Sequence, residues 1–215
     1  MKLVKYNLLA LAVLVVAITP SFGGSISGLY STGQLNTSWN QLDLHYTILP
    51  GSPSNSPNAY TVQPYNILCC WVTNPPGTWW ISPFVPINGQ PDGNAPEGHY
   101  IYQTTFMLAS TAGASLSGVW AVDNSATMYL NGLVVSTIAN PGFNVLTPFA
   151  TTNQTFQTGM NTITFDVFNN GCINGCGFNP TGLLVQFNTP EPSSLALFGS
   201  GVLGLGGLLR RRLRG

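Results

Sequence analysis

Few side chains in the middle of this chain could perform acid–base catalysis. His45 and His99 are its two histidines, and neither lies in a recognisable nucleophile or metal-binding motif. Asp92 and Glu97 have the side chains of a glycosidase carboxylate pair, but they share a loop rich in Gly and Pro, where solvated turn residues are the usual occupants. We therefore expect that the protein is not an enzyme, with a secreted glycan hydrolase as the alternative.

Carboxylates of the same region could instead bind a hard cation. Asp92, Glu97 and Asp123, together with backbone carbonyls, would supply the oxygen ligands that Ca²⁺ prefers. Asp123-Asn124 is more typical of a turn in which the side chain bonds to its own backbone. We expect no cofactor, and a structural Ca²⁺ at these three residues is the alternative.

Two adjacent tryptophans, Trp79 and Trp80, follow Pro75-Pro76-Gly77. Neighbouring residues of a strand point to opposite faces, so one of the two indoles is expected at the surface, where a flat ring could stack on a sugar. Packing in the core or in a loop is the alternative for both. The remaining tryptophans are expected to fill the core: Trp39, Trp71 and Trp120.

The four cysteines are Cys69, Cys70, Cys172 and Cys176. In an exported chain this number favours disulfides. Neighbouring cysteines are too close for ordinary disulfide geometry, so two crosslinks between the region near residue 70 and the region near residue 174 are expected. A tetrathiolate zinc site is the alternative, although adjacent cysteines do not have the spacing of a zinc knuckle.

The elements that would position these residues are short strands. Ala126 to Leu130 and Leu133 to Thr137 flank Asn131-Gly132, the strongest short signal for a hairpin. Residues 162–167 alternate between polar and apolar side chains after the turn at residues 159–161. Further strands are expected at residues 42–49, 67–73, 100–108, 116–122 and 183–187, and loops at 51–57 and 83–96. This pattern predicts an all-β protein, an antiparallel β-sandwich.

Positive charge is confined to the two ends of the chain. No Lys or Arg occurs between residues 6 and 209, although the formal net charge is +0. The middle is therefore mildly acidic, which excludes nucleic acid as a partner, because phosphates need cationic side chains. Attraction to an acidic polymer is excluded for the same reason, and a polysaccharide would be held by aromatic stacking and neutral hydrogen bonds.

The first 23 residues have the order of a secretory signal peptide. A short basic region precedes the apolar run from Asn7 to Ile18, and Pro20 and small residues follow. The apolar run is shorter than the roughly 20 residues that a spanning helix needs. We expect cleavage after Gly23 and a single domain from residue 24 to residue 189.

Residues 190–215 form a second targeting segment. Pro190-Glu191-Pro192 precedes the uncharged stretch 193–209, which as a helix would reach about 25 Å, and the basic residues Arg210, Arg211 and Arg212 follow. This order resembles the PEP-CTERM sorting signal of Gram-negative bacteria. The resemblance implies that an exosortase, a membrane protease, recognises the Pro-Glu-Pro element and removes the tail while the arginines hold it in the inner membrane. It also implies association with exopolysaccharide and biofilm at the cell surface or in the extracellular matrix.

A second resemblance concerns the domain. Trp120-Ala121-Val122-Asp123-Asn124, Tyr129-Leu130-Asn131-Gly132 and the segment 159–167 resemble the jelly-roll domains of the galactose-binding-like group. The resemblance implies a jelly-roll-like sandwich, flanked here by the signal peptide and a hydrophobic sorting helix. Because this fold hosts many functions, we expect a domain that associates with polysaccharide without catalysis, and a passive structural protein without a ligand and a secreted glycan hydrolase remain the alternatives.

Overall fold

The computed structural model describes residues 26–54, 56–64, 71–89, 91–92, 94–152, 155–171 and 178–188. They belong to a compact unit that extends from Ile26 to Thr189. The predicted signal peptide, the sorting segment and all four cysteines lie outside the described residues. Within the described ranges, no helix is long and apolar enough to cross a membrane.

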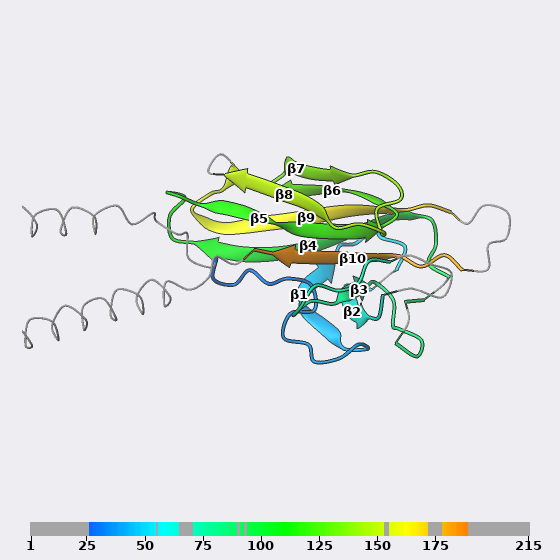
Figure 1. The fold of residues 1–215 in the computed structure, drawn as a ribbon. Helices are drawn as coiled ribbons and strands as arrows, with labels where there is room; N and C mark the ends of the chain where they lie inside the picture. The colour runs from blue at the N-terminus through cyan, green and yellow to red at the C-terminus, as the bar shows by residue number, and fades with distance from the viewer. Residues whose placement is uncertain are drawn as a thin grey trace, which may run out of the picture. The chain divides into compact units, whose positions relative to one another are not determined.

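The described residues form one antiparallel sheet of ten strands in the order β7-β6-β9-β4-β1-β2-β3-β10-β5-β8. The strands are β1 (Leu42–Ile48), β2 (Asn58–Val62), β3 (Trp80–Ser82), β4 (Gly98–Leu108), β5 (Ser115–Asp123), β6 (Ser125–Leu130), β7 (Leu133–Ile138), β8 (Thr147–Thr152), β9 (Gly159–Asn169) and β10 (Gly182–Phe187). Figure 1 labels them along the chain. The all-β prediction is confirmed.

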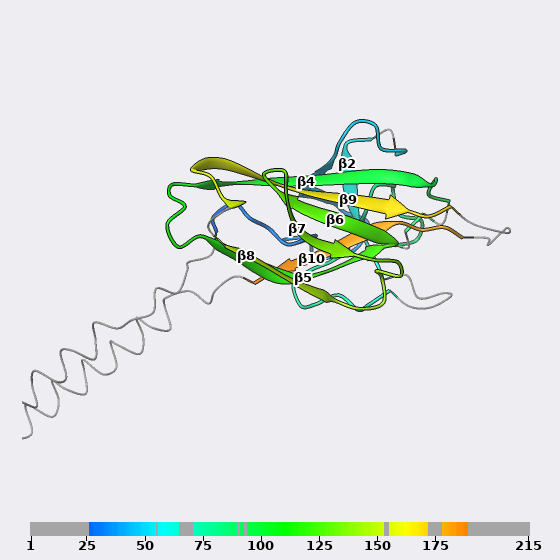
Figure 2. The ribbon, with the colours of Figure 1, turned by 90° about the horizontal axis from the view of Figure 1, so that it is seen from above.

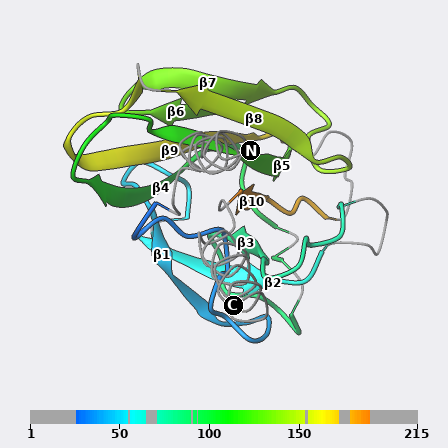
Figure 3. The same ribbon diagram turned by 60° about the vertical axis from the view of Figure 1, so that its left-hand side comes forward.

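The sheet folds over on itself into two layers. Seen from above, β4, β9, β6 and β7 lie on one side, and β10, β5 and β8 lie on the other (Figure 2). In Figure 3, β1, β2 and β3 lie beneath these layers and carry the sheet from β4 to β10. The terminal strands β7 and β8 also contact each other, so the sandwich is nearly closed.

The main core lies between the two layers because the central strands alternate in polarity. β4 and β9 pair without interruption from Gly98↔Asn169 to Leu108↔Gly159. Every second residue of these strands is buried, so the large side chains point inward while polar ones remain on the outer face. The inward side chains include Tyr100, Tyr102, Phe106, Ile163, Phe165 and Val167.

A second, smaller core lies on the other face of β5 and β10. It consists of Val62, Trp71, Trp80, Ala121 and Leu184. Both faces of β10 are therefore covered, which explains why Leu183, Leu184 and Val185 are all buried rather than alternating.

The Asn-Gly hairpin is confirmed. Asn131 and Gly132 connect β6 to β7 with φ angles of 52° and 82°, the positive values that this two-residue turn requires. The Asn131 side chain also donates to Thr155 O and to Asn161 Oδ1, and accepts from Thr162 N. These bonds fix the turn against the segment that leads into β9.

The prediction of a strand at residues 67–73 is wrong for residues 71–73, the part of this range that the structure describes. Trp71 to Thr73 belong to no strand. The backbone N–H of Val72 donates to Phe143 O at 2.7 Å, and its carbonyl accepts from Trp80 Nε1 at 2.9 Å. This segment is therefore held by a loop and a side chain rather than by a neighbouring strand. The sequence also failed to indicate β2, β3 and β8.

Candidate functional site

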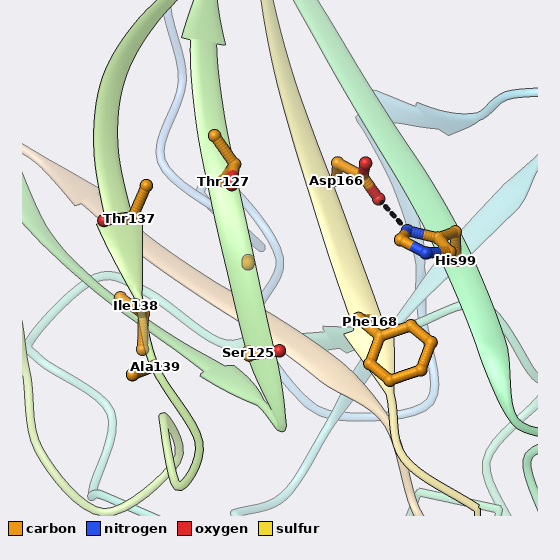
Figure 4. A pocket seen from close by; sticks show the side chains of 9 residues that line it. His99, Ser125, Thr127, Thr137, Ile138, Ala139, Asp166 and Phe168 are labelled. Carbon is orange, nitrogen blue, oxygen red and sulfur yellow. Dashed lines mark hydrogen bonds and ion pairs between the residues drawn. The ribbon is translucent and has the colours of Figure 1, made fainter.

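A shallow hollow of about 460 Å³ lies on the outer face of β4, β9, β6 and β7. The strand register builds it. His99 and Ser125 both pair with Phe168, and Thr127 pairs with Asp166 on one side and Thr137 on the other. Residues from four strands thus form two adjacent rows on one face, as Figure 4 shows. We call this surface the His99 hollow; it is lined by His99, Ser125, Ala126, Thr127, Thr137, Ile138, Ala139, Asp166 and Phe168.

His99 and Asp166 form the polar centre of the hollow. His99 Nδ1 lies 2.7 Å from Asp166 Oδ1, and the two side chains are 61% and 30% exposed. An ionised carboxylate can only accept hydrogen bonds, so Nδ1 carries the proton and Nε2 of a neutral ring is left as an acceptor. The bond fixes the orientation of a side chain that solvent would otherwise leave mobile.

Phe168 provides the apolar surface of the hollow. Its ring centroid lies 4.9 Å from that of His99, with the ring planes inclined by 48°. Phe168 is half-buried, so part of the ring stays available to a ligand. Ser125, Thr127 and Thr137 add hydroxyl groups to the lining, and Ala126, Ile138 and Ala139 add apolar groups. An aromatic face beside a carboxylate, an imidazole and several hydroxyls can hold a sugar ring by stacking and hydrogen bonding.

Of the two adjacent tryptophans, the structure buries Trp80 fully and Trp79 in part. Trp80 is 0% exposed; its ring lies 4.2 Å from that of Trp71. Trp79 is half-buried, and its Nε1 donates to Asn36 O at 3.3 Å. A Cβ on Gly33 would lie 2.5 Å from Trp79 Cβ, so the chain packs closely on this tryptophan. Neither residue lines the His99 hollow. Trp80 is therefore not the exposed member of the pair, and the alternative of packing in the core holds for this residue.

The other tryptophans are divided between core and surface. Trp71 and Trp120 are buried, as the sequence predicts. Trp39 is 39% exposed, so its assignment to the core is wrong. It covers Gly89, where an added Cβ would lie 2.7 Å from the indole ring.

The three predicted Ca²⁺ ligands are not brought together into a recognisable ligand set. In the described part of the chain, no group of three or more His, Cys, Asp or Glu side chains is positioned to hold a metal ion. Asp92 Oδ1 accepts the backbone N–H of Asn94 at 3.0 Å, which is a turn interaction. Glu97 is exposed, whereas Asp123 is 4% exposed and bonds to Trp71.

Asp123 is a buried carboxyl group at the end of β5. Its Oδ2 accepts Trp71 Nε1 at 2.9 Å, and Oδ1 has no hydrogen-bond partner among the described residues. Desolvation raises the pKa of Asp123 to about 7, although the Trp71 hydrogen bond acts in the opposite direction. Its backbone carbonyl accepts Thr181 Oγ1 at 2.9 Å. Asp123 therefore joins the end of β5 to the second core.

His45, the other histidine, lies beside a second buried carboxyl group. Asp43 accepts the backbone N–H groups of Gly33 at 2.7 Å and His45 at 2.8 Å. Burial raises the pKa of Asp43, and these backbone hydrogen bonds partly oppose the rise. The His45 ring stacks on Tyr30 with centroids 3.7 Å apart. This arrangement connects the segment before β1 to the strand.

The comparison with protein families identifies a sorting signal near the carboxyl end of the sequence. Residues 188–212 match the PEP-CTERM protein-sorting motif. The motif prediction is thus confirmed. It indicates an exported protein whose precursor is anchored in a membrane and processed by an exosortase on its way to the cell surface. No curated protein is significantly similar to the chain.

Two solved structures are distantly similar to the chain. One is an FMN-binding beta-glucuronidase from Facaelibacterium prausnitzii L2-6, with 22% identity and a TM-score of 0.30, covering 44% of this chain and 17% of that one. Another is a beta-glucosidase from Kluyveromyces marxianus, with 13% identity and a TM-score of 0.39, covering 82% of this chain and 22% of that one. The chain thus spans about a fifth of these enzymes. At these TM-scores the similarities support no conclusion about activity.

Proposed function

We propose that the β-sandwich is a non-catalytic polysaccharide-binding module of an exosortase-sorted surface protein, and that it binds through the His99 hollow. The observation that carries this proposal is the His99–Asp166 pair, held at 2.7 Å beside the partly exposed ring of Phe168. The motif at residues 188–212 supports an extracellular position for the domain.

The geometry suits the two kinds of surface that a sugar presents. The apolar C–H face of a sugar ring can pack on Phe168, while its hydroxyls can donate to Asp166 and His99. Hydroxyl groups of Ser125, Thr127 and Thr137 can serve as either donors or acceptors. The hollow is shallow, so it would contact a few sugar units of a long polymer rather than enclose a small molecule.

The lining of the hollow supports binding rather than hydrolysis. Glycosidases of the usual kind need two carboxyl groups, about 5 Å apart in retaining enzymes and about 6.5–9.5 Å apart in inverting ones. Among the residues that the structure describes, Asp166 is the one carboxyl group that lines the hollow. We therefore propose that the sandwich attaches the protein to the exopolysaccharide or biofilm matrix of a Gram-negative bacterium and leaves the polymer intact.

A binding assay with the purified chain tests this function. Glycan-array and polysaccharide pull-down measurements should give binding that Phe168→Ala abolishes while the melting temperature changes little, because the ring is outside both cores. Met160→Ala is the matched control, since Met160 is an exposed apolar residue of the same strand that does not line the hollow. Absence of binding to every glycan would leave a passive structural protein, and release of new reducing ends would indicate the hydrolase.

A further inference from the structure

The His99 hollow is rich in hydrogen-bond acceptors and poor in donors. Asp166 can only accept when ionised, and the bond from His99 Nδ1 leaves Nε2 of the neutral ring as a second acceptor. The hydroxyl groups adapt to either role. No Lys or Arg is present between residues 6 and 209 to act as a charged donor. A complementary ligand must therefore bring the donors itself.

Backbone groups do not correct this imbalance. β9 pairs with β4 on one side and β6 on the other, and β6 pairs with β7 on its second side. The N–H groups of these inner strands are consequently used by the sheet and lie in its plane rather than pointing into the hollow. This differs from binding sites at loop ends, where free N–H groups can recognise acidic or carbonyl groups of a ligand.

Electrostatics favours the same kind of ligand. Asp166 lines the hollow, and the other acidic residues of the domain are Asp43, Asp92, Glu97 and Asp123, with no basic residue to compensate them. Uronic acids and sulfated sugars would be repelled. An ammonium group brings three donors and a positive charge, and its hydrogen bond to a carboxylate is stronger than that of a neutral hydroxyl.

We propose that the ligand of the His99 hollow is a polysaccharide with free amino groups, such as a polymer that contains glucosamine units, and that an ammonium group binds at Asp166. This inference rests on the proposed function, because it specifies the sugar class that the same surface takes. Phe168 stacks on the ring that carries the amine. An acetylated amine is a poorer partner because it has lost its charge and presents a carbonyl acceptor to a surface that offers few donors.

Calorimetric titration of the purified chain with two oligosaccharides of equal length tests the inference. One consists of glucosamine and the other of N-acetylglucosamine, and the titration is done at neutral rather than acidic pH, because a protonated imidazole would add a donor and a positive charge to the hollow. The free-amine oligomer should bind more tightly, and added salt should weaken it. Asp166→Asn retains an acceptor for His99 but removes the charge, and should weaken this binding by about tenfold or more.

Asp92→Asn separates a specific site from general attraction to an acidic protein. It removes the same formal charge from a residue that does not line the hollow, so binding should be unchanged. Equal or tighter binding of the acetylated oligomer, or equal losses in the two variants, would overturn the amine assignment and leave the polysaccharide proposal intact. If no glycan of any class binds, the proposed function itself fails.

Discussion

Replacing Asp123 with Asn should stabilise the protein at neutral and alkaline pH and leave its stability unchanged in acid. The amide has the shape of the carboxyl group and can still accept the 2.9 Å hydrogen bond from Trp71 Nε1. The substitution removes the charge of Asp123, a residue that is 4% exposed and whose Oδ1 has no hydrogen-bond partner in the described part of the chain. The substitution therefore isolates the cost of ionising this group inside the fold.

The magnitude follows from the pKa of Asp123, which burial raises from 3.8 to about 7. Below pH 3.8 the group is protonated in both the folded and the unfolded state, so its charge costs nothing. As the pH rises to about 7, the unfolded state ionises more readily than the folded state, and folding loses stability. Each pH unit contributes roughly 1.4 kcal/mol, so the full loss is of the order of 4 kcal/mol above pH 7.

Urea unfolding of the parent and Asp123→Asn proteins across this pH range measures the effect. The difference in unfolding free energy should rise from near zero in acid to several kcal/mol in favour of the variant, and should level off above pH 7. Asp43, whose pKa burial also raises, is present in both proteins and cancels in the comparison. A difference that stays constant with pH, or a variant less stable than the parent at pH 8, would refute the reasoning.

Two further predictions concern the packing of the second core and the processing of the sorting signal. Trp80→Ala should lower the unfolding free energy by about 3–5 kcal/mol in chemical denaturation, because the indole is fully buried against Trp71. Trp79 is half-buried, so Trp79→Ala should lower the unfolding free energy by less. Equal losses in the two variants would contradict this packing. Glu191 lies in the matched sorting motif, so Glu191→Ala should leave an unprocessed precursor in membrane fractions, detected by immunoblotting. The control variant Ser194→Ala should be processed normally. Normal processing of the Glu191 variant would argue against recognition of this glutamate.

Local sequence rules predicted the parts of the fold that depend on neighbouring residues. The alternation at residues 162–167 locates β9, because period-two polarity is a direct consequence of strand geometry. Strand length and composition locate β4 at residues 100–108. The Asn-Gly pair locates the β6–β7 turn, because both residues tolerate positive φ. Shorter strands gave weaker signals. β3 has only three residues, all buried, and therefore shows no alternation.

The sequence predicted the burial of Trp71 and Trp120, but not the burial of Trp80 or the exposure of Trp39. A strand alternates between two faces, but the sequence does not say whether a second layer covers the other face. Both faces of β5 and β10 are covered, and the second core on their outer face includes Trp80. Alternation alone does not say on which face of the sheet Trp80 lies. Trp39 is exposed because no second layer covers it in the described part of the chain: its indole lies over Gly89 at the surface.

The sorting signal and the charge of the domain can be read from the amino-acid sequence, because a sorting motif is a contiguous segment and the absence of Lys and Arg between residues 6 and 209 is a matter of composition. The position of the candidate binding surface depends on the fold. His99 and Asp166 are 67 residues apart, and their 2.7 Å contact exists because the register of β4 and β9 places them on adjacent rows of one face. Register depends on long-range pairing and on which face is buried, so no local pattern around either residue indicates the other.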